Sequence, residues 1–178
     1  MATIVKHKIQ RVIKTLFLIA LGLISLQSFG QGDPTDSFPD DPGGITVFPV
    51  QNISFGAFSN GITGGTVIIS PNGTRSVTGN VIPLNLGTQY FQAIFDISAP
   101  LGSIVSILNG SNATLTGSNG GSMIMSIGGS YPGSPFIITI PQPTRTPVSI
   151  GGTLTVGSNA ANPPGIYSGT FYITLNLE

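Results

Sequence analysis

From residue 45 onward, apolar residues recur at every second position in short runs, and this pattern limits what the chain can fold into. In Tyr167–Leu177 the odd positions hold Tyr, Gly, Phe, Ile, Leu and Leu, whereas the even positions hold Ser, Thr, Tyr, Thr and Asn. Side chains of a β-strand alternate between its two faces, so this spacing predicts a strand with one buried and one exposed face. The same alternation is found at Phe91, Ala93, Phe95 and Ile97, at Met123, Met125 and Ile127, and at Leu154 and Val156.

Turn-forming residues separate these runs. The sequence Ser-Pro-Asn-Gly at Ser70–Gly73 lies between Thr66–Ser70 and Thr74–Val77, where proline followed by Asn-Gly favours a hairpin turn. Two similar segments, Gly65–Ile69 and Gly152–Val156, both begin with Gly-Thr and are interpreted as the starts of two strands. No segment of ten or more residues after the first 26 has the helical period. Many short strands at this spacing predict an all-β sandwich or barrel.

The first thirty residues have the features of a cleavable export signal. Four Lys or Arg residues precede an apolar run at Leu16–Leu26, and the small residues Ser28 and Gly30 follow it. This order is typical of a secretory signal peptide, here with cleavage after Gly30. A membrane-spanning helix is the alternative, but it needs about 20 apolar residues, roughly twice the length of this run. We therefore predict that residues 1–30 are a signal peptide and that the mature chain is exported to the periplasm, the cell surface or the medium, without remaining embedded in a membrane.

Residues 31–44 are predicted to form an acidic linker rich in Pro and Gly. They contain four Asp and three Pro residues, with Phe38 as the one large apolar residue. Proline at this spacing prevents a helix, and like charges keep such a segment extended. A calcium site formed by the aspartates is the alternative, but their spacing matches no EF-hand loop. The folded domain is accordingly expected at residues 45–178.

Removal of the signal leaves a chain with little charge and few catalytic side chains. Only Arg75 and Arg145 remain against six acidic residues, a net charge of about −4, and no His, Cys, Lys or Trp remains. General bases near neutral pH are usually His, and zinc sites need His or Cys. Two arginines are too few for a surface that follows a nucleic-acid backbone. We predict that the protein is not an enzyme, binds no nucleic acid and has no catalytic, cofactor or metal residues. Asp96 and Arg75 are expected to form a structural ion pair.

Three parts of the domain resemble a known family. They are Ile53–Gly56, Gly65–Ser76, and Gly151–Gly157 followed by Tyr167–Phe171 and an alternating final strand. Together they resemble domain-of-unknown-function family 4402, exported bacterial domains of about this length that are similar to spore-coat-protein-U-like and pilin-like subunits. The resemblance implies an immunoglobulin-like or pilin-like β-sandwich of short antiparallel strands, a surface or fimbria-like role, and no catalytic residues. The segment Ala160–Pro164 is longer and stiffer than the short turn usual in the family.

The leading functional hypothesis is a structural or adhesive component of the cell surface that assembles with copies of itself. Natural sheets protect exposed edges with charge, and this domain has only Arg75, Asp96 and Arg145 between residues 45 and 177. Either loops cover these edges, or an edge is free to receive a strand from another chain. The segment Ile45–Val50 is either the first strand of its own domain or a strand donated to a neighbour.

The alternative hypothesis is a glycan-binding β-sandwich module. Sugars usually stack on exposed Trp or Tyr side chains. Trp is absent, and Tyr172 falls on the polar face of its predicted strand. A single exposed tyrosine in a polar strand is the favoured explanation for Tyr172, and the glycan reading is kept as the alternative.

Overall fold

The computed structural model describes residues 43–178, and every regular element in this range is a β-strand. The named strands pair only in the antiparallel sense, which confirms the prediction of an all-β sandwich of antiparallel strands. No helix in this range has the length and apolarity needed to cross a membrane. The predicted signal peptide and residues 31–42 of the predicted linker lie outside the described residues. The strands are β1 (Thr46–Gln51), β2 (Ser54–Phe55), β3 (Phe58–Ile69), β4 (Arg75–Pro83), β5 (Tyr90–Phe91), β6 (Ala93–Ser98), β7 (Ile104–Asn109), β8 (Ala113–Gly117), β9 (Ser122–Tyr131), β10 (Phe136–Ile137), β11 (Thr146–Val156), β12 (Tyr167–Ser168) and β13 (Ile173–Leu177).

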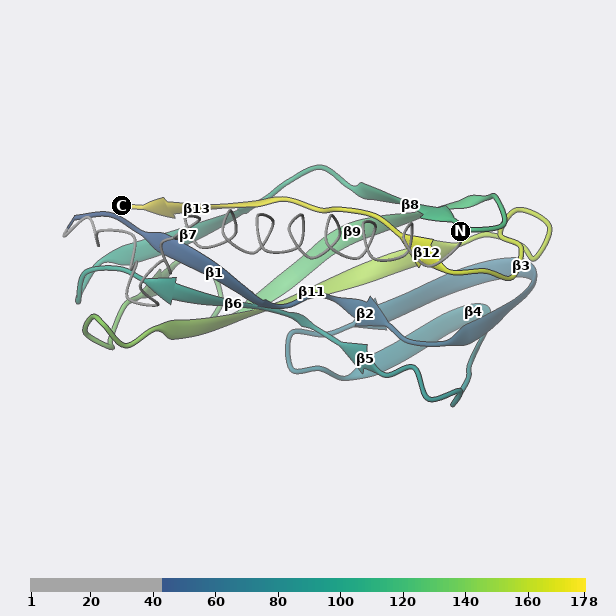
Figure 1. The fold of residues 1–178 in the computed structure, drawn as a ribbon, viewed down its shortest axis with the longest axis horizontal. Coiled ribbons are helices and arrows are strands. Elements are labelled where there is room, and N and C mark those ends of the chain that lie inside the picture. The colour runs from purple at the N-terminus through teal and green to yellow at the C-terminus, as the bar shows by residue number, and fades with distance from the viewer. Residues whose placement is uncertain (1–42) are drawn as a thin grey trace, which may run out of the picture. The chain divides into compact units, whose positions relative to one another are not determined.

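The largest sheet is built around β11, which pairs along both of its edges (Figure 1). On one edge the first half of β11 pairs with β6 and the second half pairs with β3. On the other edge β11 pairs with β9. The sheet continues outward from β6 to β1, from β3 to β4, and from β9 through β8 to β12. Strands β1, β4 and β12 therefore end this sheet.

The change of partner along β11 falls at two glycines, Gly151 and Gly152. The register between β11 and β9 shifts between Ile150 and Gly152, which marks a bulge. A Cβ atom on Gly151 would lie 2.5 Å from the carbonyl oxygen of Ile69. Glycine is thus required at this close approach of the β3 backbone to β11.

The prediction that Gly65 and Gly152 begin strands is wrong. Both lie within longer strands, because β3 begins at Phe58 and β11 begins at Thr146. The two Gly-Thr segments instead pair with each other, with Gly65 opposite Val156. A Cβ atom on Gly65 would lie 2.1 Å from the carbonyl oxygen of Thr78, so this glycine also marks a close approach of two backbones and not a strand end.

The predicted hairpin at Ser70–Gly73 is confirmed and joins β3 to β4. The Gly73 amide donates to the Ser70 carbonyl at 2.9 Å, and the Thr74 amide donates to Asn72 Oδ1 at 3.1 Å. Gly73 alone supplies the positive φ, of 82°, that the turn needs. The side chain of Asn72 therefore stabilises the turn by hydrogen bonding.

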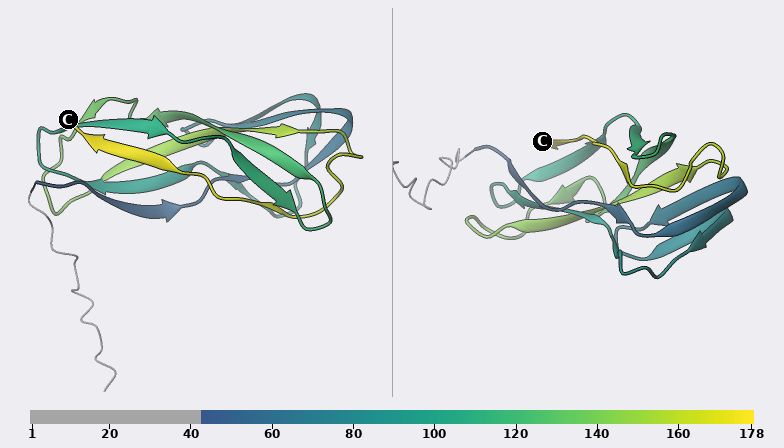
Figure 2. Two further views of the ribbon diagram at one scale, coloured as in Figure 1. Left: turned by 90° about the horizontal axis from the view of Figure 1, so that it is seen from above. Right: turned by 45° about the vertical axis from the view of Figure 1, so that its right-hand side comes forward.

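The predicted single strand at Tyr167–Leu177 is interrupted in the structure. Its first part, β12, pairs with β8 in the large sheet, whereas its last part, β13, pairs with β7 in a separate sheet of order β10-β7-β13. Figure 2 (left) shows the yellow C-terminal strand β13 beside the teal strand β7. Gly169–Tyr172 between them belongs to no strand. The chain changes sheet here, so one continuous ladder cannot form.

The predicted strand through Phe91 and Ile97 is also divided, at Gln92. Strand β5 pairs with β2 in a two-stranded sheet, and β6 belongs to the large sheet. Ala93 and Ile97 are buried as expected, but the side chain of Phe91 is 39% exposed. The alternation therefore identifies the inward face only for β6.

Two apolar clusters form the core. The first joins β2, β3, β4, β8, β9 and β11, and it contains Met123, Met125, Leu154 and Val156, as the alternation predicts. The second lies between the β6–β11 part of the large sheet and the β10-β7-β13 sheet. Burial on the facing sides of two sheets is the packing of a β-sandwich. Phe171, in the segment that changes sheet, packs against both clusters.

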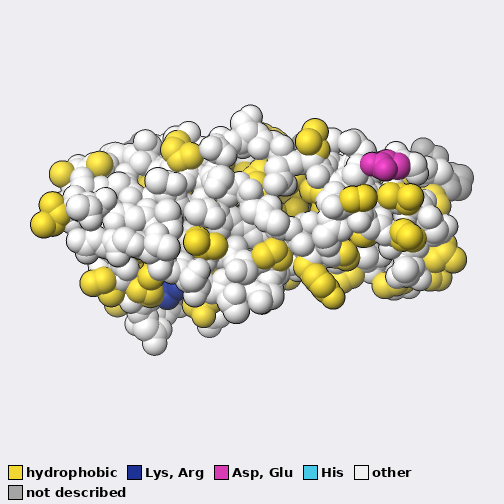
Figure 3. Space-filling view, turned by 180° about the vertical axis from the view of Figure 1, so that it is seen from behind, with side chains coloured by type: hydrophobic (Ala, Val, Ile, Leu, Met, Phe, Trp, Pro, Cys, Tyr) yellow, Lys and Arg dark blue, Asp and Glu magenta, His cyan; other side chains and the backbone are white. Residues whose placement is uncertain are grey.

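The surface of the described residues carries very little charge. Between residues 43 and 178 the charged side chains are Arg75, Asp96, Arg145 and Glu178. On the face in Figure 3 charged groups are sparse among white polar groups and yellow apolar side chains. Several large apolar side chains are more than half exposed, among them Val50, Ile62, Ile82, Leu86, Leu101, Leu108, Ile137 and Ile166.

Candidate binding groove

A groove of about 840 Å³ lies over the first core cluster. One wall is the segment around β2, from Pro49 to Phe58, and the other wall is the segment from Asn162 to Phe171. Binding sites for small ligands and peptide side chains have volumes of roughly 300–1,000 Å³, so the groove is large enough to hold one. Its floor consists of side chains from three strands of the large sheet: Leu115, Met123, Met125 and Leu154.

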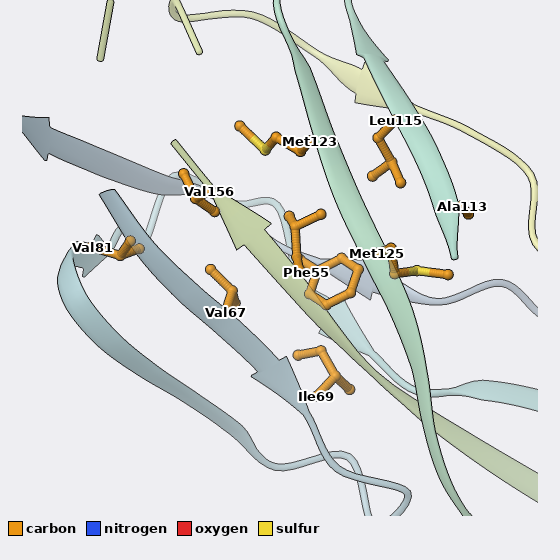
Figure 4. Packing of buried hydrophobic residues seen from close by; sticks show 10 residues of the cluster. Phe55, Val67, Ile69, Val81, Ala113, Leu115, Met123, Met125 and Val156 are labelled. Atoms are coloured by element: carbon orange, nitrogen blue, oxygen red, sulfur yellow. The ribbon is translucent and has the colours of Figure 1, made fainter. Parts of the chain in front are cut away.

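The floor of the groove is apolar and its rim is polar but uncharged. Figure 4 shows Phe55 from β2 directed toward Met125 of β9 and toward the side chains of β3, with Leu115 and Met123 beyond it. Phe95 and Phe171 close one part of the groove, with ring centroids 6.4 Å apart at an interplanar angle of 83°. None of the described residues that line the groove is charged. The groove therefore suits an apolar or uncharged occupant.

The second wall is held in place by a buried asparagine, Asn162. Its side chain is only 2% exposed. Its Nδ2 donates to the carbonyls of Ser122 at 2.7 Å and Ala161 at 3.1 Å, and its Oδ1 accepts from the Gly157 amide at 2.5 Å. The Tyr167 hydroxyl adds a hydrogen bond of 2.8 Å to the Pro163 carbonyl. These bonds fix the shape of the loop Ala160–Pro164, which the sequence predicts to be longer than the family's turn.

One side of the groove continues into an unprotected strand edge. Gly169–Tyr172 belongs to no strand, and β13 after it pairs only with β7 among the described strands. From Gly169 to Leu177 the chain has no charged residue and no proline. The other free edge beside the groove, β1, differs because it contains Pro49 and a register shift between Pro49 and Gln51. Proline and bulges are devices that discourage further pairing, so the Gly169–Leu177 edge is the more open of the two.

The folded domain matches the model of a known protein family. A family model described as "Domain of unknown function (DUF4402)" matches residues 45–177. The chain belongs to the DUF4402 family. The resemblance found in Ile53–Gly56, Gly65–Ser76 and Gly151–Gly157 is thereby confirmed. The match spans β1 to β13, so the whole groove lies within the DUF4402 domain. Neither the curated proteins nor the solved structures contain a match to the chain.

The ion pair expected between Asp96 and Arg75 in this DUF4402 domain is not formed. Arg75 Nη1 donates to the carbonyls of Phe55 and Ala57, at 3.2 Å each, and the guanidinium lies 4.4 Å from the centroid of the Tyr90 ring. Arg145 similarly lies 3.6 Å from the centroid of the Phe48 ring. Within residues 43–178 the partners of the two arginines are carbonyl oxygens and aromatic rings, not carboxylates. Asp96 lies opposite Phe48 and Pro147 in the ladder of β6.

The tyrosine singled out for glycan binding lies outside the groove. Tyr172 is 74% exposed, in agreement with its place on the polar face of the predicted strand. It does not line the groove, whereas Tyr167 does. Within residues 43–178 of this DUF4402 domain, no three His, Cys, Asp or Glu residues come together as metal ligands would. Asn162 was missed by sequence reasoning; the only signal was its place before two prolines in the unusual loop.

Proposed function

We propose that this DUF4402 chain is an exported structural or adhesive component of the cell surface that assembles with copies of itself. The basic and apolar segments at the start of the chain support export. The lack of His, Cys and Lys after residue 30 supports a role without catalysis. N-terminal sequencing of the protein from fractionated cells tests the export step, with Gln31 as the expected first residue. An uncleaved chain in the cytoplasm would contradict it.

The observation that carries the proposal is the uncharged edge Gly169–Leu177 beside an apolar groove. An extended segment that adds to a sheet edge gains main-chain hydrogen bonds, and its alternate side chains enter neighbouring pockets. Here the half-buried side chains of Ile53, Phe95 and Phe171 line such a pocket next to the edge. The occupant we assign is an extended segment from a second copy of the chain, because neither the edge nor the groove carries a charge that would select a charged ligand.

The segment best suited for donation is β1. None of its six residues is buried, and its sole strand partner in the structure is β6 of the same chain. Its separation from β6 therefore breaks a single strand pairing and takes no fully buried side chain of β1 out of the core. The segment precedes every other strand of the domain and carries Val47 and Phe48 on opposite faces. Donation of β1 along a row of copies is a head-to-tail contact, and such contacts build filaments when they do not close.

Size-exclusion chromatography and electron microscopy of residues 31–178 test the assembly. We expect oligomers or filaments from this chain and from one that lacks residues 31–44, and loss of assembly when residues 31–51 are removed. A strictly monomeric protein whose truncation changes nothing would contradict the proposal.

A pair of matched lysine substitutions separates edge pairing from general destabilisation. Thr174→Lys places a charge on the free edge of β13, and such a charge is expected to stop assembly. Thr155→Lys places the same charge on the exposed face of β11, which pairs on both edges and has no free edge to protect. Only Thr174→Lys should give a monomer. Assembly by both variants, or by neither, argues against pairing at this edge.

A further inference from the structure

A second cleft, distinct from the apolar groove in its chemistry, lies around Arg75. It has a volume of about 630 Å³ and is lined by the segment that follows β4. Thr88 borders both clefts, but Arg75 and Tyr90 line only this one. The lining residues are Arg75, Pro83, Leu84, Asn85, Gly87, Thr88, Gln89 and Tyr90.

The guanidinium of Arg75 is fixed in position with one edge left unbonded. A guanidinium carries five N–H groups. The two N–H groups on Nη1 donate to the carbonyls of Phe55 and Ala57, at 3.2 Å each. The three N–H groups on Nε and Nη2 have no hydrogen-bond partner among residues 43–178. The Nε–Nη2 edge is a fork that binds a planar carboxylate through two parallel hydrogen bonds.

No carboxylate of the described part of the chain meets this fork. Asp96 and Glu178 are the acidic residues between 43 and 178, and neither pairs with Arg75. The two carbonyl bonds and the Tyr90 ring hold the guanidinium in one position. A pre-positioned donor loses little freedom when a ligand arrives, which favours binding.

The rest of the cleft is suited to a ring that carries hydroxyl groups. Asn85, Thr88 and Gln89 are exposed, and their amide and hydroxyl groups have no partner within residues 43–178. Amides and hydroxyls both donate and accept hydrogen bonds, as sugar hydroxyls require. Tyr90 adds a flat ring that is 40% exposed. We propose that this cleft binds a uronic-acid residue of an acidic polysaccharide, with its carboxylate on the Nε–Nη2 edge of Arg75.

NMR titration of isotope-labelled residues 31–178 with oligomers of glucuronic acid tests the site. We expect shifts concentrated at residue 75 and residues 83–90, no comparable binding of a neutral glucose oligomer of the same length, and weaker binding at higher ionic strength. Thr174→Lys offers a monomeric background if assembly broadens the spectra. Shifts elsewhere on the domain, or equal binding of the neutral oligomer, would overturn the proposal.

Substitutions at Arg75 test the role of the fork. Arg75→Gln and Arg75→Lys should each weaken binding by about tenfold or more, because Lys keeps the charge but not the two parallel bonds. Arg145→Gln is the matched control and should leave binding unchanged. If the Arg75 variants unfold, the location of the shifts in the unmodified protein decides the question. Equal affinity of Arg75→Gln and the unmodified protein, or equal binding of an Asp-rich peptide, would refute a uronic-acid site.

Discussion

Replacement of Asn162 by alanine tests how the groove wall is held. The substitution removes an amide that makes three hydrogen bonds, two as donor and one as acceptor. It leaves the Gly157 amide and the Ser122 carbonyl without these partners. An unpaired polar group costs about 1–3 kcal/mol when fully buried. Gly157 is half-buried and Ser122 is exposed, so the lower end of this range applies to each. A loss of about 2–3 kcal/mol in the free energy of unfolding follows.

Thermal and denaturant unfolding of Asn162→Ala measure this loss. For a domain of this size we expect the midpoint temperature to fall by about 5–10 °C. Asn159→Ala is the matched control, because Asn159 lies directly before the loop Ala160–Pro164 and its exposed side chain makes no hydrogen bond among the described residues. It should change stability by less than about 0.5 kcal/mol. Equal stability of the two variants would refute the role assigned to Asn162.

Two further substitutions test particular contacts. Gly151→Ala should destabilise the domain by about 1–3 kcal/mol, because its Cβ would lie 2.5 Å from the Ile69 carbonyl oxygen, whereas Gly129→Ala, with open space around it, should be nearly neutral. Denaturant midpoints of the pair decide this, and equal midpoints would count against the close approach of β3 and β11. Tyr167→Phe should lower stability by about 0.5–1.5 kcal/mol through loss of the 2.8 Å hydrogen bond to Pro163. An unchanged unfolding midpoint for Tyr167→Phe would show that this bond adds nothing to the wall.

The alternation in the sequence predicts which side chains are buried better than it predicts where strands end. Met123 and Met125 face the core because a period of two holds within one strand. The break between β12 and β13 was missed because Phe171 keeps the alternation while the chain crosses from one sheet to the other. Gly65 and Gly152 were misread because glycine within a strand and glycine at its start give the same local pattern. Only the pairing of β3 with β11 distinguishes the two cases.

The candidate sites depend on contacts between residues far apart in the sequence, which a single sequence does not contain. The groove joins a segment near residue 55 to one near residue 165. The expected pairing of Arg75 with Asp96 rested on charge alone, because Asp96 is the one acidic residue between residues 45 and 177. In the structure the Arg75 guanidinium donates to the carbonyls of Phe55 and Ala57. Every residue has a backbone carbonyl, so the sequence does not indicate which carbonyls accept these bonds. The scarcity of charge on the strands, in contrast, could be predicted from composition alone.

Disulfide cross-linking tests most directly whether one copy donates β1 to the edge of another. The chain has no Cys, so each introduced Cys is unique. Val50→Cys and Thr170→Cys, made in separate chains, place an exposed thiol on the donated strand and on the receiving edge. A disulfide forms only when the two Cα atoms come within about 7 Å. We predict a mixed disulfide dimer when the two chains are oxidised together, and its loss when the receiving chain also carries Thr174→Lys. If Val50→Cys links no better to Thr170→Cys than to Thr155→Cys, donation of β1 to this edge is contradicted.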